Sequence, residues 1–265
     1  SIGDPASVRG ASLGVHGEAC MLPWTWRLIE ESDKCISVEL RAYMLRTPFE
    51  LTKRLTLRSG TRMLSICERA QNHGQVAMPL CWGHHPALGG PVLEGEVYVD
   101  IPARRGFTYD ISFHPDFPAA RKFEWPHVTA ELDVSCMPAL NGRWAGICCA
   151  TELTEGWCAL TNPGLELGFA LAFDMQLFAY VWLWMVYEGM EHYPWYGRTR
   201  CLAMEPYSSV PDNLEKAIAQ NTALWLGPGE CMETEMCAML YTSKARIAHV
   251  DLRGNIISKG GDNIC

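Results

Sequence analysis

The spacing of apolar and polar residues predicts strands along most of the chain. Residues 36–44 alternate strictly between apolar and polar side chains, and a period of two is typical of a half-buried strand. Further short strand candidates follow at residues 51–57, 61–68, 96–101, 144–151, 156–161, 233–242 and 245–252. Turn residues separate these runs, among them Ser59-Gly60, Asn141-Gly142 and Asn162-Pro163-Gly164. Many short strands with such punctuation predict an all-β fold, a sandwich or a barrel.

Residues 165–187 form the longest apolar stretch, and about 20 such residues are enough to span a bilayer. Asp174 lies near its middle, and a central aspartate costs about 2.5 to 3.5 kcal/mol on insertion scales. We therefore expect two buried strands interrupted at Asp174. Helical periodicity is scarce, and residues 211–221 predict one short turn of helix that Asp212 caps. A proline among the tryptophans of residues 22–26 predicts an edge strand.

Composition narrows the class of protein. The 265 residues predict a single domain over residues 1–265, and 48% hydrophobic residues are enough for a large core. The net charge of −8, without a run of basic residues, argues against nucleic-acid and membrane partners and favours a neutral small molecule. The chain begins without methionine, which favours a processed or truncated N-terminus.

Twelve cysteines are present, but none forms a Cys-x-x-Cys motif. Cys67, Cys81 and Cys237 lie among apolar neighbours, which is typical of small buried side chains in a reducing compartment. No secretory signal segment is visible at the start of the chain. We therefore expect a cytoplasmic protein.

Candidate chemistry lies in three stretches. Glu205 follows the apolar run at residues 201–204 and precedes Pro206, which predicts a carboxylate at the end of a strand. His84 and His85 follow a second apolar run, and adjacent strand residues point to opposite faces. The third stretch is His16-Gly17-Glu18. Taken alone, each stretch has a plainer interpretation: Glu205 as a solvated carboxylate, and the histidines as side chains that hydrogen-bond to the backbone. No His-Glu-x-x-His or zinc-finger spacing is present, so we expect no metal.

Taken in order, these stretches resemble the aldose 1-epimerase (galactose mutarotase) family. His16-Gly17-Glu18 is similar to the family's His-Gly-Gly element, and residues 72–86 are similar to the strand that ends in its second histidine. Glu205-Pro206, followed by Gly227-Pro228-Gly229-Glu230, resembles the family's glutamate block and its Pro-Gly-Glu turn. Together these blocks span residues 16–230.

The resemblance implies a large antiparallel β-sandwich that interconverts the α and β anomers of an aldose. In it, Glu205 matches the general base, His85 the general acid and His16 a histidine that assists at the substrate oxygens. Ring opening needs one proton to leave the anomeric hydroxyl and another to reach the ring oxygen, so a carboxylate and an imidazole on opposite sides of the ring suffice. We therefore expect neither a metal nor a redox cofactor.

The remaining candidates concern substrate binding. The matched segments make Trp82 and His84 candidates, while Asp174 is the nearest match to the family's sugar-binding aspartate or is structural. Tyr193 and Trp195 lie in a loop-like run before Glu205, and flat rings suit the apolar faces of a sugar. Arg198 is a candidate for a charged substrate group or an ordinary solvated residue. Trp182 and Trp184 share one strand face, and we expect them to pack in the core.

The sequence also departs from the family. Only Arg9 precedes His16, in a context unlike that of the family's sugar-binding arginine. Two alternatives stay open: a non-catalytic carbohydrate-binding protein, and a glycoside hydrolase or lyase on the same fold. A hydrolase needs a second carboxylate, for which the sequence offers Glu18, Glu188 and Glu191. The sugar, its phosphorylation and the oligomeric state are open.

Overall fold

The structure is a computed structural model that describes residues 5–210 and 213–264. The chain divides into two compact units: unit 1 is Ser1–Trp82 with Ser208–Ala238, and unit 2 is Gly83–Tyr207 with Met239–Cys265. β19 (Cys231–Tyr241) contributes residues to both. The single domain over residues 1–265 stays a prediction.

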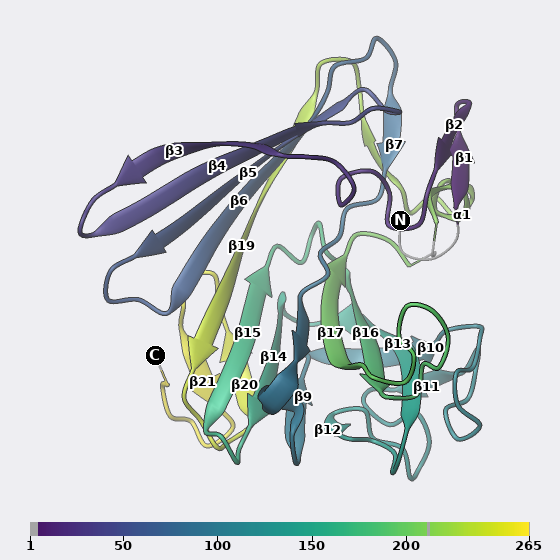
Figure 1. Cartoon of the computed structure of the whole chain (residues 1–265), viewed down its shortest axis with the longest axis vertical. Helices are drawn as coiled ribbons and strands as arrows, with labels where there is room; N and C mark the ends of the chain where they lie inside the picture. The colour runs from purple at the N-terminus through teal and green to yellow at the C-terminus, as the bar shows by residue number, and fades with distance from the viewer. Residues whose placement is uncertain (1–4, 211–212, 265) are drawn as a thin grey trace. The chain divides into compact units, whose positions relative to one another are not determined.

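The main element of unit 1 is an antiparallel run of strands that Figure 1 shows side by side in purple and blue. In order they are β6 (Met63–Asn72), β5 (Phe49–Arg58), β4 (Cys35–Tyr43) and β3 (Thr25–Glu31). The strand predicted at residues 36–44 is confirmed as β4. The predicted edge strand is confirmed in position, since β3 ends the order, although it begins at Thr25 rather than Leu22.

The burial of β4 differs from the expected pattern. Ile36 is exposed, whereas the polar Ser37 and Glu39 are buried. Hydrogen bonds across the sheet explain this: the Ser37 hydroxyl lies 2.9 Å from that of Thr56, and Glu39 accepts from arginine side chains. Buried polar groups are stable when they are paired in this way.

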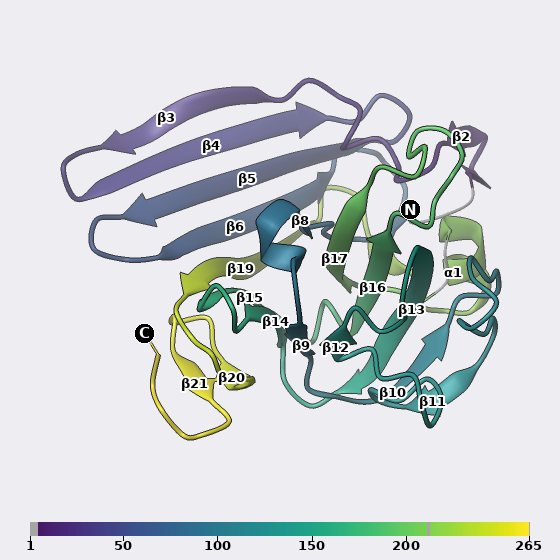
Figure 2. The same ribbon diagram turned by 60° about the horizontal axis from the view of Figure 1, so that its bottom comes forward.

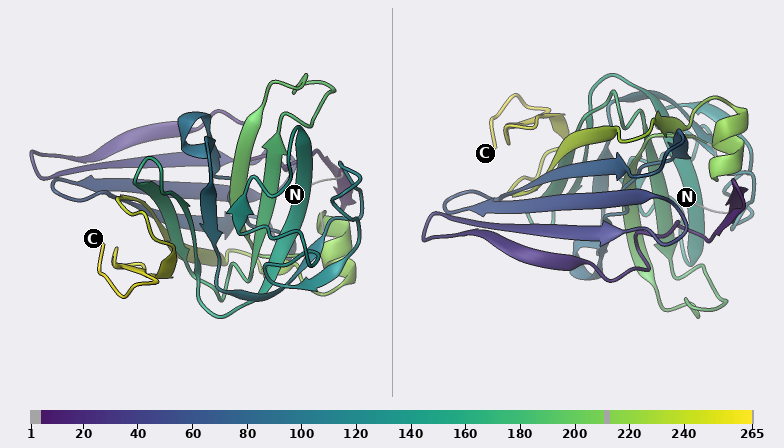
Figure 3. Two further views of the ribbon diagram at one scale, coloured as in Figure 1. Left: turned by 90° about the horizontal axis from the view of Figure 1, so that it is seen from below. Right: turned by 90° about the horizontal axis from the view of Figure 1, so that it is seen from above.

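Unit 1 also contains a smaller group of elements. They are β1 (Ala6–Val8), β2 (Ala11–Leu13), β7 (Met78–Leu80), α1 (Leu214–Ala219) and β18 (Leu224–Leu226). Leu214 of α1 packs with residues of β1 and β2, beside which the helix lies in Figure 3. The helix predicted at residues 211–221 is confirmed in shorter form, and Asn213 caps it by accepting from the Lys216 amide. Asp212, the predicted cap, lies outside the described residues.

Unit 2 contains a six-stranded antiparallel sheet, part of which Figure 2 shows in green and teal. Its order is β11 (Lys122–Glu124), β10 (Ala103–Thr108), β13 (Trp144–Leu153), β16 (Tyr180–Tyr187), β17 (Arg200–Tyr207) and β8 (Ala87–Gly89). β13, β16 and β17 are buried along nearly their whole length. These central strands therefore hold their side chains rigidly.

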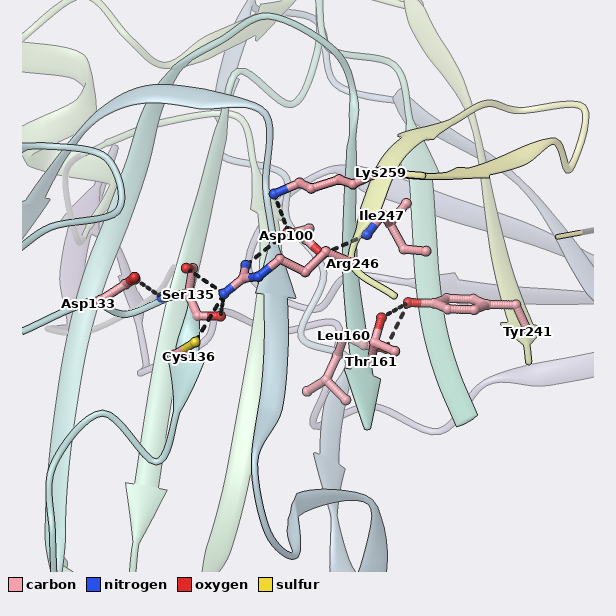
Figure 4. Close-up of polar contacts among 10 residues, drawn as sticks. All are labelled: Asp100, Asp133, Ser135, Cys136, Leu160, Thr161, Tyr241, Arg246, Ile247 and Lys259. Carbon is pink, nitrogen blue, oxygen red and sulfur yellow. Dashed lines mark hydrogen bonds and ion pairs between the residues drawn. The ribbon is translucent and has the colours of Figure 1, made fainter. Parts of the chain in front are cut away.

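A second group of strands completes unit 2. These are β12 (Cys136–Met137), β9 (Val97–Asp100), β14 (Trp157–Asn162) and β15 (Leu167–Phe173), with the hairpin β20 (Ile247–Val250) and β21 (Ile256–Ser258) and the 3₁₀ turn η1 (Gly90–Leu93). Asp100, only 5% exposed, accepts from Arg246 at 3.1 Å, from the Ile247 amide at 2.8 Å and from Lys259 at 3.2 Å (Figure 4). One carboxylate thus ties the hairpin to β9.

The prediction for residues 165–187 is confirmed, because β15 and β16 are separate strands with Asp174 between them. The Asp174 carboxylate accepts from the Gln176 amide at 2.9 Å and so stabilises the turn. Within the part of the chain that the structure describes, no helix is long and apolar enough to cross a membrane.

The cysteine prediction is confirmed only in part. All eleven cysteines among the described residues are free thiols, and Cys237 is buried as expected. Cys67 is exposed, because alternation along β6 turns its side chain outward. Cys81 is half-buried and packs against the cluster that contains Leu214. The cytoplasmic location stays a prediction.

Candidate functional site

The register of the six-stranded sheet aligns one row of side chains across its centre. Glu205 on β17 lies opposite Trp182 on β16, which lies opposite Cys149 on β13, and Cys149 lies opposite Phe107 on β10. Directly paired residues in an antiparallel sheet point to the same face. The carboxyl group therefore lies at one end of a row of otherwise apolar side chains.

His85 extends this row beyond Glu205. The His84 amide donates to the Pro206 carbonyl at 3.0 Å, and the Met204 amide donates to the Pro86 carbonyl at 3.3 Å. These bonds place His85 beside Glu205, and its Nε2 lies 3.3 Å from Glu205 Oε1. His84 lies on the other face, where its ring makes an edge contact with Phe178 at 5.3 Å between centroids.

A glycine allows this close approach. The Tyr207 ring lies over Gly83, and a Cβ atom at Gly83 would come within 1.7 Å of Tyr207 Cδ2. Since carbon atoms in contact stay about 3.5 Å apart, any other residue at position 83 would push the segment away from β17. The segment that leads into His85 therefore requires Gly83.

The structure corrects the predicted position of Glu205. It is not at a strand end but within β17, and it is only 2% exposed. Burial raises its pKa from the ordinary 4.5 to about 8, since a low-dielectric environment disfavours the charged form. Oε2 is buried and makes no hydrogen bond with any residue that the structure describes. His85, by contrast, keeps 43% of its side chain exposed.

Aromatic rings surround the pair. The His85 ring lies 5.9 Å from that of Trp184, which lies 5.1 Å from Trp195, measured between centroids. Trp182 makes edge contacts with Phe107 at 5.4 Å and with Tyr109 at 6.2 Å. Trp182 is buried as expected, whereas Trp184 is half-buried and touches the pair rather than only the core.

The structure places the other candidates of unit 2 farther out. Tyr193 is 80% exposed, and the Arg198 guanidinium lies 5.8 Å from the centre of the Tyr196 ring. Asp174 lies in the turn between β15 and β16, where its carboxylate bonds to backbone. Contact of these residues with a substrate stays a prediction.

Two candidates belong to unit 1. His16 is exposed in the turn after β2, in a left-handed conformation with φ of 63°. The Trp82 indole donates to Glu68 at 3.1 Å. Their part in a site with the pair of unit 2 stays a prediction.

Two of the three carboxylates considered for a hydrolase bind other groups of the protein. Glu18 accepts from the Leu45 and Arg46 amides at 2.9 and 2.7 Å. Glu188 pairs at 3.2 Å with Arg200, which is five residues from Glu205 along β17, or about 16 Å. Glycoside hydrolases hold their two carboxyl groups roughly 5 to 9.5 Å apart, so the position of Glu188 does not fit.

Sequence reasoning missed four residues of the row and its surroundings, namely Phe107, Tyr109, Cys149 and Tyr207. Only Tyr207 had a readable signal, because it lies two residues after Glu205 and must share its face. Phe107 and Cys149 reach the row through strand pairing, and Tyr109 follows directly after β10. Among the described residues, no three histidine, cysteine, aspartate or glutamate side chains gather as metal ligands would.

Solved structures of other proteins share this architecture. The Slr1438 protein of Synechocystis sp. PCC 6803 is 19% identical over 91% of this chain and 74% of its own, with a TM-score of 0.65. A candidate aldose 1-epimerase from Klebsiella pneumoniae is 13% identical over 92% of this chain, with a TM-score of 0.67, and this chain spans 61% of it. A galactose mutarotase-like protein from Lactobacillus casei is 18% identical over 91% of this chain and 82% of its own, with a TM-score of 0.61.

These similarities show that the fold is the predicted one, the galactose mutarotase-like antiparallel β-sandwich. No curated protein matches the chain. One family model, described as "Domain of unknown function (DUF4432)", matches residues 1–239. Because that match covers most of the sequence, the chain belongs to this family.

Proposed function

We propose that this protein interconverts the α and β anomers of an aldose. The observation that carries the proposal is the contact of 3.3 Å between His85 Nε2 and Glu205 Oε1 on a rigid sheet. The similarity in fold to a candidate aldose 1-epimerase and a mutarotase-like protein supports it.

The geometry suits the two oxygens that exchange protons. In a cyclic aldose, the anomeric hydroxyl and the ring oxygen are attached to the same carbon. A base for one and an acid for the other can therefore lie side by side, as Glu205 and His85 do at 3.3 Å, and not on opposite sides of the ring as the sequence led us to expect. Trp184, packed against His85, offers an apolar ring face to the sugar.

In the forward step, Glu205 takes the proton of the anomeric hydroxyl while His85 gives a proton to the ring oxygen. The bond between the anomeric carbon and the ring oxygen breaks, and the anomeric carbon becomes an aldehyde. Rotation about the adjacent carbon–carbon bond turns the other face of the aldehyde to the ring oxygen. Closure then returns one proton to His85 and one to the anomeric oxygen, so both groups recover their starting states.

The pair needs one proton between its two groups. A catalytic acid or base works best when its pKa is near the working pH, and burial raises the pKa of Glu205 to about 8. The carboxyl group can therefore both take and release a proton near neutral pH. Oε1, the oxygen that faces His85, accepts the hydroxyl of the sugar, because Oε2 is closed off from the surface.

The direct test is polarimetry or NMR on freshly dissolved α-glucose and α-galactose. Wild-type protein is expected to accelerate anomer exchange, and Glu205→Gln is expected to lower the rate about 10² to 10⁴-fold. Glu188→Gln is the matched control, because it removes a carboxylate of the same unit that pairs with Arg200. Sugar binding without acceleration would instead favour the non-catalytic alternative. Release of a reducing end from a glycoside would favour a hydrolase.

A further inference from the structure

The segment between β16 and β17, residues 188–199, forms a rigid projection that we call the aromatic arm. Its backbone closes on itself: the Glu188 amide donates to the Thr199 carbonyl at 2.8 Å, and the amides of Trp195 and Tyr196 both donate to the His192 carbonyl. The Gly197 amide donates to the Met190 carbonyl at 2.8 Å. These bonds fix the direction in which the arm presents its side chains.

Arg143 holds the arm from outside. Its Nε donates to the Glu188 carbonyl at 3.0 Å, and its Nη1 lies 3.5 Å from the Glu191 carboxylate. Gly197 has φ of 67°, and a Cβ atom there would come within 2.0 Å of Arg143 Nη2. The guanidinium therefore occupies the space that a side chain at position 197 would fill, and only glycine permits this contact.

The arm is continuous with the proposed catalytic pair. Trp195 packs on Trp184 at 5.1 Å, and Trp184 packs on His85 at 5.9 Å. Any sugar held at His85 and Glu205 thus lies near the base of the arm. A second ring attached to that sugar would extend toward the arm's exposed side chains.

Two tyrosines and an arginine are among those exposed side chains. Tyr193 is 80% exposed and Tyr196 57% exposed, and their rings form an edge contact at 6.2 Å. The Arg198 guanidinium lies 5.8 Å from the centre of the Tyr196 ring. Tyrosine supplies a large amphipathic surface with little conformational entropy to lose, and guanidinium donates several hydrogen bonds in a fixed geometry. This set suits the apolar faces and hydroxyl groups of a pyranose ring.

We infer that the preferred substrate is a reducing disaccharide or longer oligosaccharide rather than a free monosaccharide. The reducing ring occupies the His85–Glu205 pair, and the next ring contacts Tyr193, Tyr196 and Arg198. This inference rests on the proposed anomer exchange and specifies its substrate class. The chemistry takes place only at the reducing ring, so the arm contributes binding and not proton transfer.

The experiment compares glucose with maltose, cellobiose and lactose, using exchange NMR at the reducing-end anomeric proton. The measured quantity is kcat/KM for each disaccharide divided by that for glucose. We expect at least one disaccharide to be preferred by the wild type on the order of tenfold, and the double variant Tyr193→Ala, Tyr196→Ala to lose that preference. Both tyrosines are exposed, so the double variant is expected to fold.

Tyr43→Ala is the matched control, because it removes a tyrosine of similar exposure, 58%, that is not part of the arm. It should keep the wild-type ratio. A ratio of one or below for all three disaccharides in the wild type overturns the inference. An unchanged ratio in the double variant also overturns it.

Failure of the proposed function gives a different result. If no aldose exchanges its anomers faster, isothermal titration calorimetry with the same disaccharides decides the inference alone. Binding that weakens about tenfold in the double variant and not in Tyr43→Ala supports the arm as a sugar-binding element. Absent binding, or binding that does not depend on the tyrosines, overturns it.

Discussion

Both units bury glutamates within antiparallel sheets, but the glutamates of the two units differ in the partners that surround the carboxylate. In unit 1, Glu39 forms ion pairs with Arg27 and Arg54, at 2.7 and 3.2 Å. In unit 2, one oxygen of Glu205 lies 3.3 Å from His85, and the other makes no hydrogen bond within the described residues. A buried carboxylate is stable when cations and donors satisfy it.

The two neighbouring glutamates of unit 1 follow the first pattern. Glu50 lies 3.2 Å from Arg41 and 2.9 Å from His73. Glu68 lies 2.7 Å from Lys53. These ion pairs join adjacent strands of the sheet. The glutamates of unit 1 and Glu205 therefore differ in the number of partners and not in burial.

The pKa values follow the same division. Burial raises the pKa of Glu39, but hydrogen bonds from Arg27 and Arg54 outweigh it, and the net pKa is lowered. Burial alone raises the pKa of Glu205, to about 8. One group stays charged and holds the sheet together, while the other can change its charge near neutral pH.

The largest expected effect is on the rate of anomer exchange. It tests the comparison through the two histidines that contact buried glutamates. His85→Asn removes the proposed acid and is expected to slow anomer exchange about 10² to 10⁴-fold. His73→Asn, which loses the contact with Glu50, should leave the rate unchanged. Polarimetry at pH 7 measures both. Equal losses in the two variants would mean that the rate reports folding and not proton transfer.

The second effect is on stability. The folded-state pKa of Glu205 is raised above its ordinary value of 4.5, so its contribution to stability is fully present below about pH 4.5 and is lost as pH rises through about 8. Glu205→Gln removes this loss and should raise the free energy of unfolding by roughly 2 to 5 kcal/mol at pH 9, but little at pH 4.5.

Urea denaturation at several pH values between 4.5 and 9 measures this effect. The wild type should lose stability with rising pH relative to Glu205→Gln. A variant that is less stable than the wild type at pH 9 would contradict the assignment of Glu205 as an unsatisfied carboxyl group.

The smallest effect has the opposite sign. Glu39→Gln weakens two charged contacts and should lower the free energy of unfolding by about 1 to 2 kcal/mol near neutral pH. Both arginines are largely exposed and stay hydrated, which limits the loss. The same denaturation experiment measures it. A stabilised Glu39→Gln would remove the distinction between the two units.

Local patterns predicted the strands better than their arrangement. Alternation identified β4, and the charge of Asp174 marked the break between β15 and β16, because both signals depend on neighbours in sequence. The sequence could not place Cys149 or Phe107 beside Trp182, since strand order and register depend on contacts between distant segments. The expectation for β4 also failed in detail, because ion pairs across the sheet allow Glu39 to be buried.

The position of Glu205 was predicted wrongly because Pro206 was interpreted as the end of the strand. The Pro206 carbonyl accepts from His84, so its nitrogen faces the same side, toward β8. β8 pairs only with the stretch from Cys201 to Ala203, and the missing N–H group therefore costs no bond on the β16 side. The chain can continue through the proline to Tyr207.

The contacts of the Asp100 carboxylate also determine where the chain can be truncated. The family match ends at residue 239, yet Arg246, Ile247 and Lys259 all bind Asp100 inside unit 2. The Tyr241 hydroxyl likewise lies 2.7 Å from that of Thr161. A recombinant fragment that ends at the family boundary would leave the Asp100 carboxylate buried without its counter-charges. The C-terminal hairpin is therefore an integral part of the folded protein.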